Sequence, residues 1–235
     1  MKEKRMIKIA SLNLWRFNEW ERRLPLIVES IKKVNPDIIF FQEMQTDISF
    51  DKRNQLDILN SFLKYPHQMF TLADIKTKRK GVPLSHPVDH GLGVLSKFEF
   101  STDKIMLTKA EDDKEQRILQ VNNFNIDGQN FNLANIHFSN SDKWAEAHFK
   151  ETLDILKDKK TGIIGDFNIK DIKKYRELFE KVYISSADFK DYVSYPEDNL
   201  SYDYMLIPND YIFDDFECID ANISDHRMIV AEISM

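Results

Sequence analysis

Several short, mostly apolar segments of this sequence end in a polar side chain that can bind a metal ion or transfer a proton. Each segment has the character of the last residues of a buried strand. The segments are 7–12, 38–42, 133–136, 163–165 and 223–224, and the side chains that follow them are Asn13, Glu43, His137, Asp166 and Asp225. Strand ends commonly form the ligand crevice of α/β sheets, so residues far apart in sequence meet there. The pattern predicts a sheet-rich fold with one polar pocket.

The rest of the chain has the pattern of mixed helices and strands. Apolar residues at helical spacing predict helices over roughly 20–34, 55–63, 144–156 and 172–179. Further strands are expected at 91–95, 98–107, 118–126, 131–138, 204–207, 211–219 and 228–233. The pair Asp127-Gly128 is a hairpin-turn signal between two of them. Because strands are joined both by hairpins and through helices, we expect an α/β sandwich with mixed sheets.

Length and charge narrow the class of protein. A chain of 235 residues fits a single domain, residues 1–235. The net charge of −6 excludes a globally basic binder of nucleic acid. It does not exclude an enzyme that acts on phosphates, because a metal ion can supply positive charge. The dense basic run at 76–80 is expected to be a solvated loop, with contact to a phosphate backbone as the alternative.

The sequence also indicates a compartment. The single cysteine, Cys218, cannot form an internal disulfide, which fits a reducing environment. The first residues lack the apolar stretch and small-residue cleavage site of a signal peptide. No run approaches the roughly 18 apolar residues of a membrane span. We therefore expect a cytoplasmic protein with no membrane span, and we infer no stable protein partner.

The polar residues at strand ends are weak indicators when taken singly. A glutamate or histidine after a strand is usually solvated or structural, and Gly165-Asp166-Phe167-Asn168 also suits a tight turn. Their joint occurrence is informative. Carboxylate and amide oxygens suit Mg²⁺ or Mn²⁺, whereas a zinc site would require more histidine or cysteine. Two histidines, His137 and His226, beside carboxylates suit proton transfer near neutral pH.

Seven short motifs together resemble the endonuclease/exonuclease/phosphatase superfamily, which has the deoxyribonuclease-I-like fold. The motifs are Ser11-Leu12-Asn13-Leu14-Trp15, residues 36–43, residues 89–97, Asn135-Ile136-His137-Phe138, Gly165-Asp166-Phe167-Asn168, Tyr202-Asp203-Tyr204-Met205 and Ser224-Asp225-His226. The resemblance covers nearly the whole chain. It implies a four-layered α/β sandwich, in which two mixed β-sheets pack face to face and are flanked by helices. It also implies hydrolysis of a phosphoester by an activated water.

The resemblance implies a metal site and phosphate contacts. Glu43 would hold a divalent cation, Mg²⁺ or Mn²⁺, with Asp225 as a second carboxylate on the metal side. Asn13 would contact the metal or the phosphate. Arg117 matches a common arginine of the family and is expected to contact the scissile phosphate, where a guanidinium suits the oxygens. The alternative for Arg117 is a salt bridge at a strand end.

The resemblance further implies catalytic side chains. Asp166 and Asn168 would orient the nucleophilic water and the phosphate. His226 would be a general base or a phosphate contact, and Asp203 would orient a histidine. His137 would donate to the leaving group or stabilise the phosphorane-like state. These roles agree with the physics of phosphoryl transfer, which is mostly positioning and neutralisation of charge.

The substrate is left open. We expect a metal-dependent phosphodiesterase, with nucleic acid or a related diester as substrate. A phosphomonoesterase acting on an inositol-phosphate-like or nucleotide substrate is the alternative, and a non-catalytic binding protein on the same fold is a third possibility. His137 resembles the deoxyribonuclease, sphingomyelinase and inositol-phosphatase branches rather than abasic-site endonucleases. The residues before Asp203, at 200–202, lack the basic residue common in the family, which together with the acidic charge argues against a long duplex.

Overall fold

The computed structural model describes residues 5–79, 81–109 and 115–234. In this part of the chain, twelve strands form two mixed six-stranded sheets. The strands β1 and β2 of the first sheet run parallel, and its other neighbours run antiparallel. The first sheet has the order β11 (Ile212–Ile219), β12 (Met228–Ser234), β1 (Met6–Asn13), β2 (Ile38–Thr46), β4 (Val82–Ser96) and β3 (His67–Arg79).

The second sheet repeats this plan with one parallel pair, β7 and β8, among antiparallel neighbours. Its order is β5 (Phe100–Met106), β6 (Ile118–Ile126), β7 (Gln129–His137), β8 (Thr161–Asp166), β10 (Asp203–Pro208) and β9 (Tyr183–Ser185). The predicted hairpin is present, because β6 and β7 pair on either side of Asp127-Gly128. Both residues of this turn have positive φ, as the hairpin requires.

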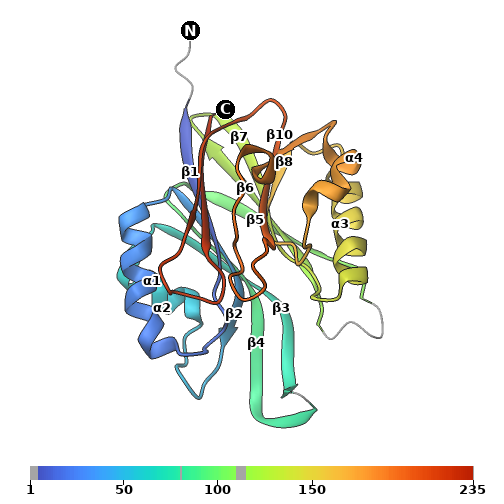
Figure 1. The fold of residues 1–235 in the computed structure, drawn as a ribbon. Coiled ribbons are helices and arrows are strands. Elements are labelled where there is room, and N and C mark those ends of the chain that lie inside the picture. The colour runs from blue at the N-terminus through green and yellow to red at the C-terminus, as the bar shows by residue number, and fades with distance from the viewer. Residues whose placement is uncertain (1–4, 80, 110–114, 235) are drawn as a thin grey trace.

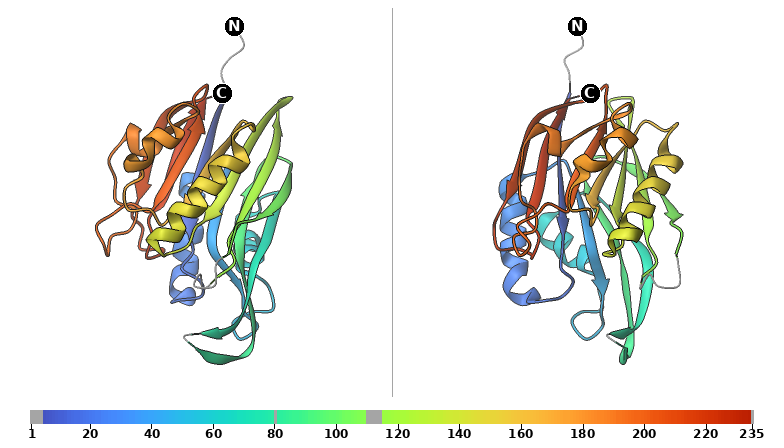
Figure 2. Two further views of the ribbon diagram at one scale, coloured as in Figure 1. Left: turned by 90° about the vertical axis from the view of Figure 1, so that its right-hand side faces the viewer. Right: turned by 45° about the vertical axis from the view of Figure 1, so that its right-hand side comes forward.

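Helices cover the outer faces of the two sheets (Figures 1 and 2). The helices α1 (Trp20–Val34) and α2 (Gln55–Leu63) pack on the first sheet, where their apolar faces join one core cluster with β1, β2 and β4. The helix α3 (Asp142–Leu156) packs on the second sheet, and the short helices are η1 (Ile172–Tyr175), α4 (Arg176–Phe179) and α5 (Ser186–Phe189). The predicted four-layered sandwich is confirmed.

A central core lies between the two sheets. It joins Ile9 and Phe40 of the first sheet to Phe131, Ile164 and Met205 of the second, and all five side chains are buried. Strands with both faces covered read as continuous apolar runs, as in 38–41. This core fixes the sheets against each other, so their strand ends hold a constant relative position.

One part of the first sheet differs from expectation. The predicted strand 91–95 is only the inner part of β4, and β4 and β3 extend beyond the body of the protein as a two-stranded arm (Figure 1). The described part of the basic run, residues 76–79, is therefore the end of β3 and not a loop, and Lys80 lies outside the described residues. The outer arm has little core to pack against, so its sequence lacks the apolar alternation that would reveal strands.

Other predicted elements agree to within a few residues. The segment 172–179 is a 3₁₀ turn followed by α4 instead of one helix. The short strand β9 is present although the sequence gives no signal for it. No helix within the described ranges is long and apolar enough to span a membrane.

Candidate active site

Neighbouring strands of the second sheet bring three polar side chains into a row. Asp166, the last residue of β8, pairs with His137 on β7 and with Asp203 on β10. All three side chains are buried. The strand register therefore places a histidine on one side of Asp166 and a second carboxylate on the other.

The first sheet supplies further polar side chains where its parallel pair ends. Asn13 ends β1 opposite Gln42 of β2, and Glu43 follows Gln42. Asn13 Nδ2 donates to Asp166 Oδ2 at 3.0 Å. Gln42 Nε2 donates to Asn135 Oδ1 at 2.7 Å, again across the gap between the sheets. These buried hydrogen bonds fix the two sets of strand ends relative to each other.

Asp166 is the centre of the polar cluster. Its Oδ2 lies 3.5 Å from His137 Nε2 and 3.9 Å from His226 Nε2. Its Oδ1 accepts the backbone N–H of Asn168 at 2.9 Å. Burial raises the pKa of Asp166 to about 7; His226 opposes the rise and the nearby Asp203 carboxylate adds to it. Such a carboxyl group can accept or release a proton near neutral pH.

Asp203 binds the ring nitrogen of His226 that is not next to Asp166. The His226 Nδ1–H donates to Asp203 Oδ2 at 2.8 Å, and the Tyr195 ring packs beside the imidazole with 4.8 Å between centroids. Burial by itself lowers the pKa of His226. The carboxylates of Asp203, Asp166 and Asp225 outweigh burial and raise this pKa to about 10. The imidazole therefore carries a positive charge at neutral pH, and its Nε2–H is on the side of Asp166.

A bulge in β2 turns Glu43 toward the same region. The pairing of β2 with β4 shifts between Phe41 and Met44, and Glu43 has a left-handed φ of 53°. Arg16, with a φ of 55°, contacts the Glu43 carboxylate through Nε at 3.1 Å and Nη2 at 3.3 Å. Burial raises the pKa of Glu43 more than Arg16 lowers it. Left-handed backbone at a non-glycine residue costs energy, and such residues cluster at functional sites as well as at turns and helix ends.

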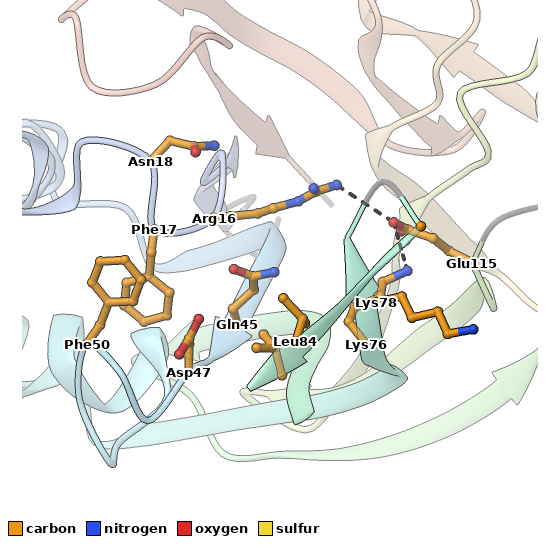
Figure 3. A pocket seen from close by; sticks show the side chains of 12 residues that line it. Arg16, Phe17, Asn18, Gln45, Asp47, Phe50, Lys76, Lys78, Leu84 and Glu115 are labelled. Carbon is orange, nitrogen blue, oxygen red and sulfur yellow. Dashed lines mark ion pairs between the residues drawn. The ribbon is translucent and has the colours of Figure 1, made fainter. Parts of the chain in front are cut away.

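Glu115 lies among the basic side chains of Arg16, Lys76, Arg117 and His90. Figure 3 shows its ion pairs with Arg16 and Lys76. Its Oε1 is 2.8 Å from Lys76 Nζ and 3.7 Å from Arg16 Nη2, and its Oε2 is 3.5 Å from Arg117 Nη2 and 3.6 Å from His90 Nδ1. Burial opposes ionisation, but the basic neighbours outweigh it and lower the pKa of Glu115 to about 2. Burial lowers the pKa of His90 to about 3. Arg117 thus forms the strand-end ion pair that the sequence left as an alternative.

The strand-end side chains line one cavity of about 410 Å³. Asp203 does not line it and reaches it through His226. The convergence expected from the strand-end pattern is therefore present. The predicted site residues that line the cavity are Asn13, Glu43, Arg117, His137, Asp166, Asn168, Asp225 and His226.

Comparison with known proteins decides the family. The sequence matches the model of the endonuclease/exonuclease/phosphatase family over residues 10–226. This chain belongs to the endonuclease/exonuclease/phosphatase family. Members of the family are generally hydrolases that act on phosphoester bonds. No curated protein sequence is significantly similar to the chain.

Solved structures of this family share the fold. An endonuclease/exonuclease/phosphatase from Beutenbergia cavernae DSM 12333 has a TM-score of 0.78 at 15% identity, over 98% of this chain and 72% of that one. The catalytic domain of human Nocturnin, with a bound sulfate anion, has a TM-score of 0.69 at 19% identity, over 98% of this chain and 97% of that one. A mannosyl-6-phosphatase from Bacteroides thetaiotaomicron VPI-5482 has a TM-score of 0.66 at 17% identity, over 97% and 100%. At these identities the likeness establishes the fold.

Members of the family generally use divalent metals, and the cavity offers suitable ligands. One group combines Asp166 and His226, which line the cavity, with Asp203, which does not, and the ligand atoms of all three lie within 4.8 Å of one another. This group differs from the set expected from sequence. In it, Asp203 Oδ2 and His226 Nδ1 are already bonded to each other.

The expected set of Glu43, Asn13 and Asp225 consists of oxygen donors, which hard divalent cations prefer. Burial raises the pKa of Glu43 and Asp225, as it raises that of Asp166. Raised pKa values mean that the negative charge of this cluster is not fully compensated by the protein. A divalent cation would supply that compensation. The side chains present therefore fit a magnesium- or manganese-type ion.

Gly165 and Arg23 fix the backbone around the site. Gly165 has a φ of 136°, and a Cβ there would lie 2.2 Å from the carbonyl oxygen of Ile136, so only glycine fits before Asp166. The buried Arg23 guanidinium donates to the backbone carbonyls of the two loops that carry Asn13, Arg16 and Asp225. Its acceptors are Leu14 at 2.9 Å, Arg16 at 3.0 Å, Asn18 at 2.7 Å and Ile223 at 2.8 Å.

Sequence reasoning missed five charged residues that line the cavity, namely Arg16, Glu115, Asp142, Lys170 and Asp198. Arg16 lies just past the motif at 11–15, in a loop whose left-handed backbone leaves no periodic pattern. Glu115 precedes β6 and lies next to Arg117, which the sequence did single out. Tyr195 also lines the cavity and contacts His226.

Proposed function

We propose that this protein is a divalent-metal-dependent phosphodiesterase. The observation that carries the proposal is the convergence on Asp166. Side chains from both sheets and from the loop before β12 lie within 4 Å of its carboxylate, and their contacts are Asn13 at 3.0 Å, His137 at 3.5 Å and His226 at 3.9 Å. Phosphoryl transfer needs such a fixed arrangement of charge more than it needs covalent chemistry.

The protonation states favour particular roles. Asp166, with a pKa near neutrality, accepts a proton from the attacking water, and Asn168 fixes one of its oxygens through the backbone N–H. The water oxygen bonds to phosphorus as the bond to the leaving oxygen breaks. His226, charged and fixed by Asp203, donates through Nε2 to a phosphoryl oxygen and stabilises the developing charge.

His137 acts on the leaving group. Burial and the neighbouring Arg117 lower its pKa well below the ordinary value, so the imidazole is neutral. Its Nε2 lies 3.5 Å from Asp166 and 3.9 Å from Glu43, which favours the tautomer with the proton on Nε2. A neutral imidazole donates a hydrogen bond to the leaving oxygen without repelling the charged His226.

Glu43, Asn13 and Asp225 are the ligands that we propose for the metal. When bound, a divalent cation polarises the phosphoryl oxygen and lowers the pKa of a bound water. The alternative ligand group of Asp166, Asp203 and His226 would consume the hydrogen bond that fixes His226. Metal titrations of Glu43→Gln and Asp203→Asn separate the two, because we expect only the first to raise the Mg²⁺ concentration needed for half-maximal activity.

A diester is favoured over a monoester by the surroundings of the site. A second cavity adjoins the first and shares Arg16 and Glu115 with it, so a phosphate beside Asp166 has room for groups on two sides. The net charge of −6 disfavours binding to the backbone of a long duplex. We therefore propose a small phosphodiester as substrate. The solved mannosyl-6-phosphatase keeps a phosphomonoester as the alternative.

Hydrolysis of bis-p-nitrophenyl phosphate beside p-nitrophenyl phosphate tests the proposal, with Mg²⁺, with Mn²⁺ and with EDTA. We expect chelator-sensitive release of nitrophenolate from the diester. Release from the monoester alone would establish the phosphatase alternative. Absence of chelator-sensitive release from both esters with both ions would contradict the proposed function and favour a binding protein on this fold.

A further inference from the structure

The protein has a second cavity of about 680 Å³, and Figure 3 shows side chains that line it. It is enclosed by the loop before α1, the end of β2 with the segment that follows it, and the β3–β4 arm. Both cavities are lined by Arg16 and Glu115, so they meet at these two side chains. Its volume is in the range of pockets that hold drug-sized organic ligands. The catalytic chemistry described above uses none of the other residues that line it.

Two stacked phenylalanines form one side of this cavity (Figure 3). The rings of Phe17 and Phe50 lie 4.7 Å apart at an angle of 2°. Phe17 is buried and packs edge-on against Trp20, whereas Phe50 is 58% exposed. The buried ring thus holds a second ring flat at the cavity wall. A planar apolar surface of this kind in water gains most from contact with another flat ring.

The opposite side is closed by the arm. His86 of β4 contacts Asp47 Oδ1 through Nε2 at 2.7 Å, which ties the arm to the segment that carries Phe50. Leu84 and Val88 add apolar surface between the two. Because this contact joins the arm to the segment after β2, the width of the cavity is set before a ligand arrives, which lowers the entropic cost of binding.

Polar groups at the rim remain available to a ligand. Gln45 and Lys78 line the cavity, and the backbone N–H of Gln45 donates to Gln55 Oε1 at 2.9 Å, a contact that does not use the Gln45 side-chain amide. An amide can hydrogen-bond both donors and acceptors on the edge of a heterocycle. The flat aromatic wall and the polar edge together match a planar heteroaromatic group better than a polyhydroxylated ring.

We propose that this second cavity binds a planar heteroaromatic group, such as a nucleobase, carried by the phosphoester substrate, and that Phe50 determines the preference for it. The inference rests on the proposed phosphoesterase function, because it assigns both cavities to one substrate. The phosphate lies at Asp166, and the organic group passes Arg16 to stack on the exposed face of Phe50. Sugar phosphates and inositol phosphates lack the flat ring and leave this surface uncovered.

Binding of two phosphates that differ only in the ring tests the proposal. We compare adenosine 5′-monophosphate with ribose 5-phosphate by titration calorimetry in EDTA, where turnover does not interfere. Stacking of a base on an aromatic side chain predicts that the nucleotide binds about 5- to 150-fold tighter than the sugar phosphate. A 5′-phosphorylated oligoadenylate shows whether the group comes from a free nucleotide or from the end of a polymer, according to which of the two binds more tightly.

Variants at Phe50 make the test specific. Phe50→Ala is expected to bring the ratio of the two dissociation constants close to one, and Phe50→Tyr to preserve it. Phe62→Ala is the matched control, because Phe62 is also half-exposed but lies on α2 and lines neither cavity. A ratio near one in the wild-type protein, a ratio unchanged in Phe50→Ala, or no binding of either ligand overturns the proposal.

The same data keep the two proposals separate. If nitrophenyl esters are hydrolysed but the nucleotide has no advantage over the sugar phosphate, the assignment of the second cavity is wrong and the phosphodiesterase function stands. If no ester is hydrolysed but the Phe50-dependent preference is observed, the cavity assignment stands and the catalytic function is wrong.

Discussion

Asp203 accepts the Nδ1–H of His226 at 2.8 Å, and this buried hydrogen bond leaves the other ring nitrogen of His226 on the side of Asp166, 3.9 Å from its carboxylate. The register of β8 and β10 makes Asp203 and Asp166 direct neighbours, so the imidazole interacts with both. The Asp203 carboxylate therefore sets both the orientation and the charge of His226.

Replacement of Asp203 by asparagine tests this relationship. We expect the pKa of His226 to fall from about 10 toward its ordinary value, because the carboxylate that stabilises the imidazolium is lost. Turnover should fall by a factor of about 10² to 10⁴. NMR titration of the imidazole and steady-state kinetics give the two readouts. Asp191→Asn is the control, because Asp191 is 95% exposed, and equal turnover of the two variants would contradict the role of Asp203.

The same pair predicts how stability depends on pH. The folded pKa of His226 is raised above the value of 6.5 for a free histidine, so the pair stabilises the folded protein fully below pH 6.5 and loses this effect as pH rises toward about 10. Urea unfolding in EDTA from about pH 6 to about pH 9.5 measures it. The difference in unfolding free energy between wild type and Asp203→Asn should be largest at about pH 6, the lowest pH of this range. A difference that grows with pH would show that His226 is neutral in the folded state.

The buried Arg23 is expected to be essential for the geometry of the site loops. Arg23→Met leaves four backbone carbonyls without their donor, and each such loss costs about 1–3 kcal/mol. We expect destabilisation of at least about 3 kcal/mol, or roughly 6–12 °C in Tm for a chain of this size. Arg22→Met is the matched control, because Arg22 is exposed and pairs with the equally exposed Glu19. Similar melting temperatures for the two variants would contradict the account.

The Glu115 cluster predicts a response to phosphate. Glu115→Gln removes the carboxylate that compensates Arg16, Lys76 and Arg117, and loss of one partner of a buried ion pair costs up to about 3–5 kcal/mol. The freed basic groups should then bind inorganic phosphate more tightly, so phosphate should raise the Tm of the variant more than that of the wild type. Glu99→Gln, at an exposed position, is the control. An equal phosphate effect on all three proteins would contradict this interpretation.

Much of the fold was predictable from sequence because buried strands leave a clear signal. The run at 38–41 and the alternation at 7–12 mark the strands that carry Glu43 and Asn13, and Asp127-Gly128 marks a hairpin. The β3–β4 arm was not predictable, because most of its outer residues are exposed and impose no apolar period.

The candidate site was predictable where its side chains follow strands and not where they depend on loops. Arg16 acquires its place from left-handed backbone that the fully buried Arg23 holds. Helical spacing from Trp20 and Ile27 places Arg23 on the buried face of α1, but the sequence does not reveal which backbone carbonyls it binds. The role of Glu115 depends on side chains from three distant segments, which only the tertiary structure brings together.

The most direct test of the central claim is the rate of bis-p-nitrophenyl phosphate hydrolysis by Asp166→Asn beside wild type, with Mg²⁺ and with EDTA. Asparagine keeps the shape of the side chain but cannot accept the proton of the attacking water. We predict that kcat of Asp166→Asn falls by a factor of about 10² to 10⁴ and that its Tm changes little. We also predict that EDTA abolishes the activity of the wild-type protein. Hydrolysis by Asp166→Asn at the wild-type rate would contradict the assignment of Asp166 as the centre of a phosphodiesterase site.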